Sequence, residues 1–177
     1  MIFDEIIGLD VVPKGEFIIN REAVRAIILN SEKQLVMIKS KIGDYSFPGG
    51  GVDNGESQLE TLKREAMEEA GVVIDDCTQL VGTVTEQRRS QEVEDAYFVM
   101  KSTYYLCYAS EYTEPKLEDY EKEWGFTPVA VEICEAYEKN LDILKHHVQC
   151  PSWVQREVFV LKSLLAHQEE LFKIGSV

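Results

Sequence analysis

The stretch GGVDNGESQLETLKREAMEEAGV, residues 50–72, decides the fold of this 177-residue chain. It begins within a run of three glycines at 49–51, which predicts a loop because glycine is costly inside a helix or strand. Ser57, followed three residues later by a glutamate, has the spacing of a capping box. Apolar residues then recur at intervals of three and four, and Gly71 is typical of a helix end. We therefore expect a glycine loop followed by a helix over residues 57–70.

Three glutamates of this helix share one face. Glu65, Glu68 and Glu69 have the spacing i, i+3 and i+4, at which like charges destabilise a helix by roughly 0.2–0.5 kcal/mol per pair. They also lie near the negative end of the helix dipole. One interpretation is a solvated acidic face. The other is a cluster of oxygen ligands for Mg²⁺ or Mn²⁺, whose charge would cancel the repulsion.

The spacing across the whole stretch resembles the Nudix box, which is glycine, five residues, glutamate, seven residues, then RE-U-x-EE-x-G-U with U apolar. All its fixed residues are present, namely Gly50, Glu56, Arg64, Glu65, Glu68, Glu69 and Gly71. The resemblance implies an α/β (α+β) fold, with an α/β/α sandwich around a mixed β-sheet. It also implies that Glu65, Glu68 and Glu69 bind Mg²⁺ or Mn²⁺, with the carbonyl of Gly49 as a further ligand.

The resemblance assigns further catalytic residues. Arg64 is expected to pair with Glu56 and to orient Glu65. Arg64 and Glu56 would then support the metal ligands without binding the metal themselves. The residue that takes the proton from the attacking water varies within the family. The acidic segment 111–123 offers Glu121 and Glu123 as candidates, although it can equally be a solvated loop.

The reaction implied by the resemblance is hydrolysis of a nucleoside diphosphate linked to another moiety X, which gives a nucleotide and phosphorylated X. One alternative is a non-catalytic ligand-binding or regulatory module on the same fold, but such modules usually lose box glutamates. Another is a structural acidic protein, which would leave Gly50, Arg64 and Gly71 unexplained.

Substrate-binding residues are less well marked. Arg88 and Arg89 can grip a phosphate in bidentate fashion, or they can be surface cations that offset nearby glutamates, including Glu92. Tyr45 precedes the glycine loop and can stack on a base. The proline found some 15 residues after the box in ADP-ribose pyrophosphatases is not evident here, where Gln87 and Arg88 occupy that region.

The formal net charge is −14, which argues against binding to nucleic acid through phosphate neutralisation and therefore against RNA decapping. We expect a small nucleotide-derived substrate, no nucleic-acid or membrane partner, and a monomer or homodimer. Residues 53–69 and 111–123 each hold six acidic residues against two basic ones, and we expect the two segments to face each other. Metal, rather than protein, would then supply the positive charge that binds a pyrophosphate.

Alternating and periodic apolar patterns predict the remaining elements of one domain, residues 1–177. Residues 22–29 and 34–39 read as a β-hairpin. Further strands are expected at 45–47, 79–85, 96–109 and near 124–130, and helices at 130–139 and 152–172.

The N-terminus lacks a secretory pattern, and no apolar run is long enough to cross a bilayer. Four scattered cysteines fit free thiols in a reducing compartment, so we expect a cytoplasmic protein. His146, His147 and Cys150 lack a fourth ligand at suitable spacing, which favours polar residues in a helix connection over a zinc site.

Overall fold

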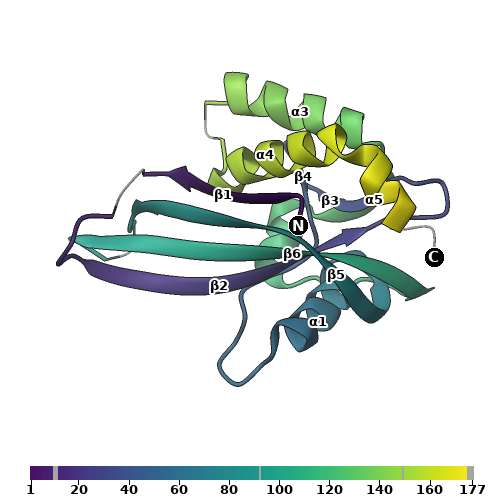
Figure 1. The fold of residues 1–177 in the computed structure, drawn as a ribbon, viewed down its shortest axis with the longest axis horizontal. Helices are drawn as coiled ribbons and strands as arrows, with labels where there is room; N and C mark the ends of the chain where they lie inside the picture. The colour runs from purple at the N-terminus through teal and green to yellow at the C-terminus, as the bar shows by residue number, and fades with distance from the viewer. Residues whose placement is uncertain (10–11, 92, 149, 175–177) are drawn as a thin grey trace.

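Two β-sheets lie between two groups of helices in the computed structural model, which describes residues 1–9, 12–91, 93–148 and 150–174 (Figure 1). The larger sheet has the strand order β1 (Phe3–Gly8), β5 (Val72–Arg89), β6 (Ala96–Tyr112) and β2 (Phe17–Ile28). The smaller sheet has the order β4 (Tyr45–Ser46), β3 (Leu35–Lys39) and β7 (Thr127–Val131). β1 is parallel to β5 and β2 to β6, whereas the other pairs are antiparallel. The sheet structure is therefore mixed, as predicted.

Helices cover both sides of the sheets, which confirms the expected α/β/α sandwich. α1 (Gln58–Ala70) lies below the sheets in Figure 1, while α3 (Ile133–His146) and α4 (Ser152–Ala166) lie above them. Two short helices, α2 (Asp119–Trp124) and α5 (Gln168–Ile174), complete the described chain.

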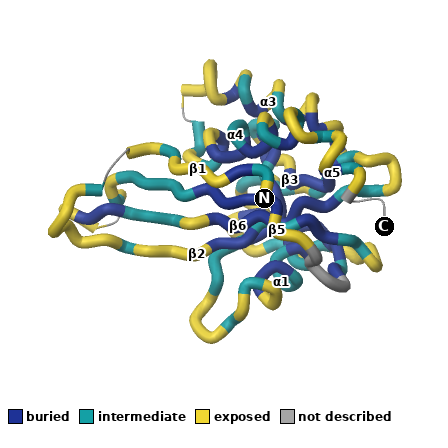
Figure 2. Tube along the Cα trace, viewed as in Figure 1, coloured by how far each residue is buried: buried dark blue, intermediate teal, exposed yellow. Residues whose placement is uncertain are grey.

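Each side of the sandwich has its own hydrophobic core. On the α1 side, Leu62 and Ala66 pack with Val24 and Ile28 of β2. On the α3–α4 side, the core includes Tyr104 of β6 with Phe47, Val160, Leu161 and Leu164. Figure 2 shows that burial is concentrated where the helices cover the strands, whereas the far ends of the long strands are exposed.

The predicted hairpin at 22–29 and 34–39 forms only at its turn, where Leu29 and Leu35 make one antiparallel bridge; beyond it the prediction is wrong, because the two strands belong to different sheets. The turn between them forms, with Asn30 Oδ1 accepting from the Glu32 and Gln34 amides at 2.9 Å. However, the edge of β2 that β3 would need is already occupied by the glycine loop. The amides of Val24 and Ala26 donate to the carbonyls of Gly50 and Pro48, at 2.9 and 2.8 Å.

Three other predicted elements differ from those observed. The helix predicted over 152–172 is interrupted at His167, whose backbone is not helical, and this break lets Leu171 of α5 reach the core. The strand predicted near 124–130 begins only at Thr127, because residues 119–124 form α2, which ends at Gly125 with a positive φ of 67°. The strand predicted at 79–85 is part of the much longer β5.

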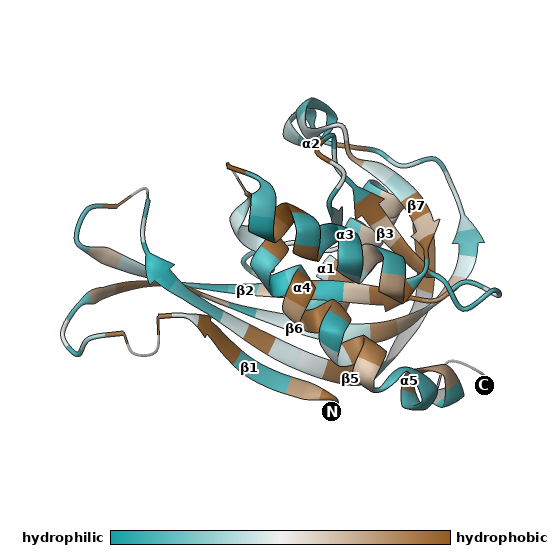
Figure 3. Ribbon diagram, turned by 90° about the horizontal axis from the view of Figure 1, so that it is seen from above, coloured by the Kyte–Doolittle hydropathy of each residue, from teal (hydrophilic) through white to brown (hydrophobic). Residues whose placement is uncertain are grey.

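The outer ends of β2, β5 and β6 extend beyond α3 and α4, as Figure 3 shows from above. We call this part, residues 17–22, 85–89 and 96–101, the arm. The described helices include none with the length and apolar character needed to cross a membrane. Cys134 and Cys150 are free thiols and Cys107 is buried; the side chain of Cys77 lies outside the description.

Candidate active site

Local sequence signals hold α1 in place and thereby position its glutamates. Ser57 caps the helix in a complete capping box with Glu60, and Gly71 ends it with a φ of 64°. The buried face of Leu62, Ala66 and Ala70 packs on the sheets. Because these contacts fix the rotation of the helix, its carboxylates lie along the edge next to the glycine loop.

Arg64 links the loop before α1 to the helix. Its Nε and Nη2 atoms donate to the two carboxylate oxygens of Glu56, both at 3.0 Å. Thr61 Oγ1 donates to the same carboxylate at 2.7 Å. These hydrogen bonds, chiefly those from Arg64, lower the pKa of Glu56 to about 2. The expected pairing of Glu56 with Arg64 is therefore present.

The same guanidinium also contacts two of the predicted metal ligands. Arg64 Nη1 lies 2.8 Å from Glu65 Oε1 and 3.2 Å from Glu68 Oε2. One cation thus offsets the like-charge repulsion that the helix sequence creates. Burial raises the pKa of Glu65.

Glu69 is directed differently from the other two glutamates. It is almost fully buried, and its Oε2 accepts a hydrogen bond from the Gly49 amide at 2.8 Å. Burial raises its pKa to about 8, although the nearby Arg25 charge and the Gly49 amide act against the shift. Glu65 and Glu68 line one cavity, whereas Glu69 lines the neighbouring one.

The glycine loop passes close to both the helix and β2. A side chain at Gly50 would clash with the carboxylate of Glu65. A side chain at Gly49, whose φ is 142°, would clash with the backbone carbonyl of Val24. The Gly49 carbonyl, an expected metal ligand, accepts a hydrogen bond from Arg25 Nη1.

The acidic segment reaches the site through α2. Glu121 is buried, with its carboxylate accepting from the Glu118 amide at 2.6 Å and from the Tyr120 hydroxyl at 3.1 Å. Glu123 is exposed and lines neither the cavity beside Glu65 and Glu68 nor the one beside Glu69; its backbone carbonyl accepts a hydrogen bond from Lys41 Nζ at 3.2 Å. Of the two predicted candidates, the structure therefore brings only Glu121 to the site.

Together these groups form a cavity of about 530 Å³, which we call the acidic cavity. Its lining comprises Arg21, Gly50, Gly51, Asp53, Arg64, Glu65, Glu68, Glu118, Tyr120 and Glu121. The two acidic segments 53–69 and 111–123 thus face each other, as expected. In the described part of the chain, no three His, Cys, Asp or Glu side chains converge closely enough to hold a metal as they stand. The donors are nevertheless hard carboxylate oxygens, which suit Mg²⁺ or Mn²⁺.

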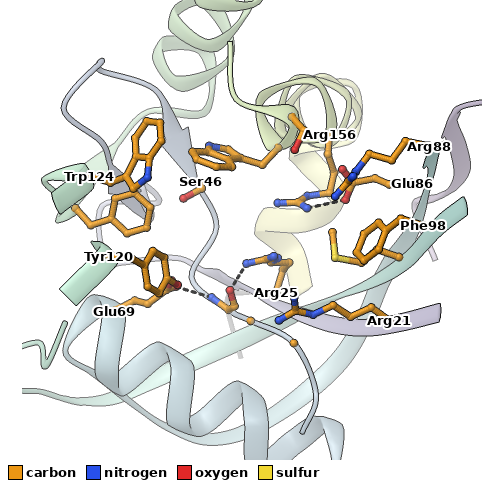
Figure 4. A pocket seen from close by; sticks show the side chains of 17 residues that line it. Arg21, Arg25, Ser46, Glu69, Glu86, Arg88, Phe98, Tyr120, Trp124 and Arg156 are labelled. Carbon is orange, nitrogen blue, oxygen red and sulfur yellow. Dashed lines mark hydrogen bonds and ion pairs between the residues drawn. The ribbon is translucent and has the colours of Figure 1, made fainter. Parts of the chain in front are cut away.

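A second cavity, of about 250 Å³, adjoins the first at Gly50 and Gly51; we call it the arginine pocket (Figure 4). Four arginines and five aromatic residues contribute to its lining: Arg21, Arg25, Arg88, Arg156, Phe98, Tyr120, Trp124, Phe126 and Trp153. Among the residues that the structure describes, Glu69 and Glu86 are the only acidic ones in its lining. The expectation that protein supplies no positive charge at the site is therefore wrong.

The predicted substrate-binding residues lie in different parts of the structure, and only one of them lines the arginine pocket. Arg88 lines the arginine pocket and lies over the Phe98 ring, 4.3 Å from its centroid. Arg89, its neighbour in β5, faces the opposite side of the sheet and lies over Tyr97 instead. Tyr45 is buried in the core and lines neither cavity, because α3 and α4 cover β4. Glu92 lies outside the described residues.

Arg156 is held at the pocket wall by two carboxylates. Its Nη1 lies 2.7 Å from Glu86 Oε2, and its Nη2 lies 2.7 Å from Glu157 Oε1. Arg156 and Glu157 are buried, and burial raises the pKa of Glu157.

The sequence contained signals for several lining residues that the prediction missed. Arg25 is a charge inside the apolar, buried second half of β2, and Arg156 and Glu157 lie on the buried face of a helix. A charge at such a position needs a partner or a function. Trp124 and Trp153 form an edge-to-face pair with ring centroids 5.3 Å apart, but their sequence separation hides this contact.

The residues weighed as a zinc site, His146, His147 and Cys150, lie at the end of α3 and in the segment that follows it. His146 is exposed and contacts Asp142 of its own helix at 3.0 Å. His147 ends α3, and Gln149 lies outside the described residues.

Comparisons with known proteins agree with this geometry. The model of the NUDIX domain matches residues 19–146. The structure is similar to the E. coli ORF135 protein, with 18% identity, a TM-score of 0.50, and coverage of 84% of this chain and 91% of that one. It is also similar to the MutT protein from Methanosarcina mazei Go1, with 17% identity, a TM-score of 0.50, and coverage of 81% and 93%. No curated protein matches the chain. Because the domain match includes the glycine loop, α1 and α2, the chain belongs to the NUDIX family and is a hydrolase of the pyrophosphate bond.

Proposed function

We propose that this Nudix hydrolase cleaves a nucleoside diphosphate linked to a moiety X, and that it does so with Mg²⁺ or Mn²⁺. The observation that carries the proposal is the junction of the two cavities at Gly50 and Gly51. Carboxylates outnumber guanidinium groups on one side of this junction, and guanidinium groups outnumber carboxylates on the other. A pyrophosphate placed there would be within reach of metal ligands and of protein cations at once.

The metal would be held by Glu65, Glu68 and Glu69, with the Gly49 carbonyl as a further oxygen donor. When bound, it neutralises charge on the phosphoryl oxygens and lowers the pKa of the attacking water. Arg64 must release Glu65 and Glu68 at least in part, and its two hydrogen bonds to Glu56 can keep it in place meanwhile. Arg25 holds the Gly49 carbonyl in position.

Glu121 is the proposed acceptor for the proton of the attacking water. It lines the acidic cavity opposite α1, and it accepts one hydrogen bond at each carboxylate oxygen. Each oxygen keeps a further lone pair for the water. Arg21 lines both cavities, so its guanidinium can contact the pyrophosphate oxygens.

The function is tested with a substrate panel and matched variants. ADP-ribose, nucleoside diphosphate sugars, dinucleoside polyphosphates, oxidised dNTPs and coenzyme A are assayed with Mg²⁺ and with Mn²⁺. Glu65→Gln and Glu69→Gln should each lower kcat about 100-fold or more, because charge stabilisation is lost in the transition state. Glu138→Gln, which removes an exposed carboxylate from α3, should leave kcat unchanged.

Two results would contradict the proposal. If the wild type binds a compound from the panel but hydrolyses none with either metal, the protein is a ligand-binding module. If Glu65→Gln and Glu69→Gln both keep wild-type rates, these residues are not the metal ligands.

A further inference from the structure

The four arginines of the arginine pocket differ in what they already bind. Arg25 donates to the Gly49 carbonyl, and Arg156 is paired with Glu86 and Glu157. Among the described residues, Arg21 and Arg88 have no carboxylate partner. An uncompensated guanidinium that lines a cavity is a natural receptor for an anion.

These two free cations lie at different places on the sheet. Arg21 is in register with Met100 and Glu86, next to the glycine loop. Arg88 is in register with Phe98. It lies two residues farther out along the arm than the pair of Glu86 and Met100, and on β5, which is separated from β2 by β6. Strand spacings place their Cα atoms roughly 12 Å apart. In Figure 4, Phe98 lies between the two side chains.

The contacts of the two side chains hold their guanidinium groups apart: that of Arg21 lies beside Gly51, whereas that of Arg88 lies over the Phe98 ring. Arg21 borders the junction where the pyrophosphate is proposed to lie, whereas Arg88 is held away from it by its contact with the Phe98 ring. The surface between them is formed by Phe98 and Met100. Such a surface suits the apolar face of a sugar or similar ring.

The charge near Arg88 also favours an anion. Glu86, the nearest acidic lining residue on the same strand, is already paired with Arg156 at 2.7 Å. The N-terminal turn of α4, with Ser152 and Trp153, forms the wall across the pocket. This wall lies beyond residue 146, where the domain match ends.

We propose that Arg88 recognises a second anionic group of the substrate, a carboxylate or a phosphate, which is separated from the scissile pyrophosphate by a ring that lies on Phe98 and Met100. This inference rests on the proposed function and narrows its substrate class. It makes Arg88 a specificity-determining residue that does not take part in the chemical step.

The experiment compares compounds that differ only in the remote anion. UDP-glucuronate and UDP-glucose differ by a carboxylate; coenzyme A and 3′-dephospho-coenzyme A differ by a phosphate. Kd is measured by calorimetry in the presence of a chelator, so that binding is read without turnover, and kcat and KM are measured separately with Mg²⁺. In at least one pair, the charged compound should bind about tenfold or more tightly, as expected for a charge-assisted hydrogen bond. The pair that shows the preference identifies the anion.

Arg88→Gln should abolish this preference by raising Kd and KM for the charged compound, with kcat nearly unchanged. Arg89→Gln is the matched control, because it removes the same charge from the opposite face of the same strand. It should keep the preference.

The inference fails if neither pair shows a preference in the wild type, or if Arg89→Gln has the same effect as Arg88→Gln. It also fails if Arg88→Gln weakens both members of a pair equally, because Arg88 would then contact the pyrophosphate itself. Failure of the proposed function gives a different result: no compound is hydrolysed, but the charged compound of a pair still binds more tightly than the uncharged one.

Discussion

At the scale of single residues, Arg64 determines the charge balance of the acidic cavity. Its guanidinium contacts Glu56, Glu65 and Glu68, and it is the only cation of α1 that does so. The Glu56 contact is made by two parallel hydrogen bonds and is the strongest of the three by geometry. Glu56 therefore anchors Arg64, while Glu65 and Glu68 remain exchangeable partners.

The Glu56 contact should be visible in the pH dependence of stability. The pKa of Glu56 is about 2 in the folded protein, below its ordinary value of 4.5. A lowered folded-state pKa stabilises the fold fully above the ordinary value, and this contribution is lost as pH falls toward 2. Urea unfolding from pH 7 to 3 should show wild type more stable than Glu56→Gln, by a margin that shrinks below about pH 4.5. A margin that stays constant over this range would contradict the assignment.

At the scale of elements, prediction succeeded where the signals are local. The capping box and Gly71 predicted the bounds of α1 to within one residue. The partner of the β2 edge could not be predicted in this way, because β3 and the glycine loop compete for it and only tertiary packing decides. The six-residue α2 was missed because its acidic sequence reads equally well as a solvated loop.

The buried ion pairs of α4 give a second prediction. Arg156→Met would leave Glu157 without its cation in the core, which costs about 3–5 kcal/mol. Arg156→Met/Glu157→Met should be more stable than Arg156→Met alone, because it removes the fully buried carboxylate that the single variant leaves unpaired, while Glu86 loses its partner in both variants. Guanidinium chloride denaturation measures both differences, and Lys162→Met, an exposed change on the same helix, should have little effect. A double variant less stable than the single one would show that Glu157 has another role.

At the scale of the whole molecule, the net charge of −14 hides a local reversal. The Nudix box could be identified from the sequence. The sequence also predicted that the acidic segments 53–69 and 111–123 face each other. The arginine pocket could not be predicted, because its cations come from β2, β5 and α4 and are brought together only by the fold. A count of charges along the chain therefore indicated metal as the sole source of positive charge at the site, whereas in the structure guanidinium groups also line it.

Metal binding should stabilise the folded protein, because the acidic cavity does not exist in the unfolded chain. At ten times its Kd, Mg²⁺ should raise the free energy of unfolding by about 1.4 kcal/mol and the Tm by roughly 3–6 °C. Calorimetric scans at increasing Mg²⁺ measure this shift, with Ca²⁺-free buffer and added KCl at matched ionic strength as the control. Glu65→Gln/Glu68→Gln should reduce the shift, and an unchanged shift would place the metal elsewhere.

The hydrogen bonds between the glycine loop and β2 give the loop a role outside catalysis. An uncovered strand edge presents free amides and carbonyls that pair readily with another chain. Here the carbonyls of Pro48 and Gly50 occupy the amides of Ala26 and Val24, so the loop that shapes the site also shields the edge of the larger sheet. Substitutions that loosen this loop would impair turnover and, at the same time, open a template for intermolecular aggregation.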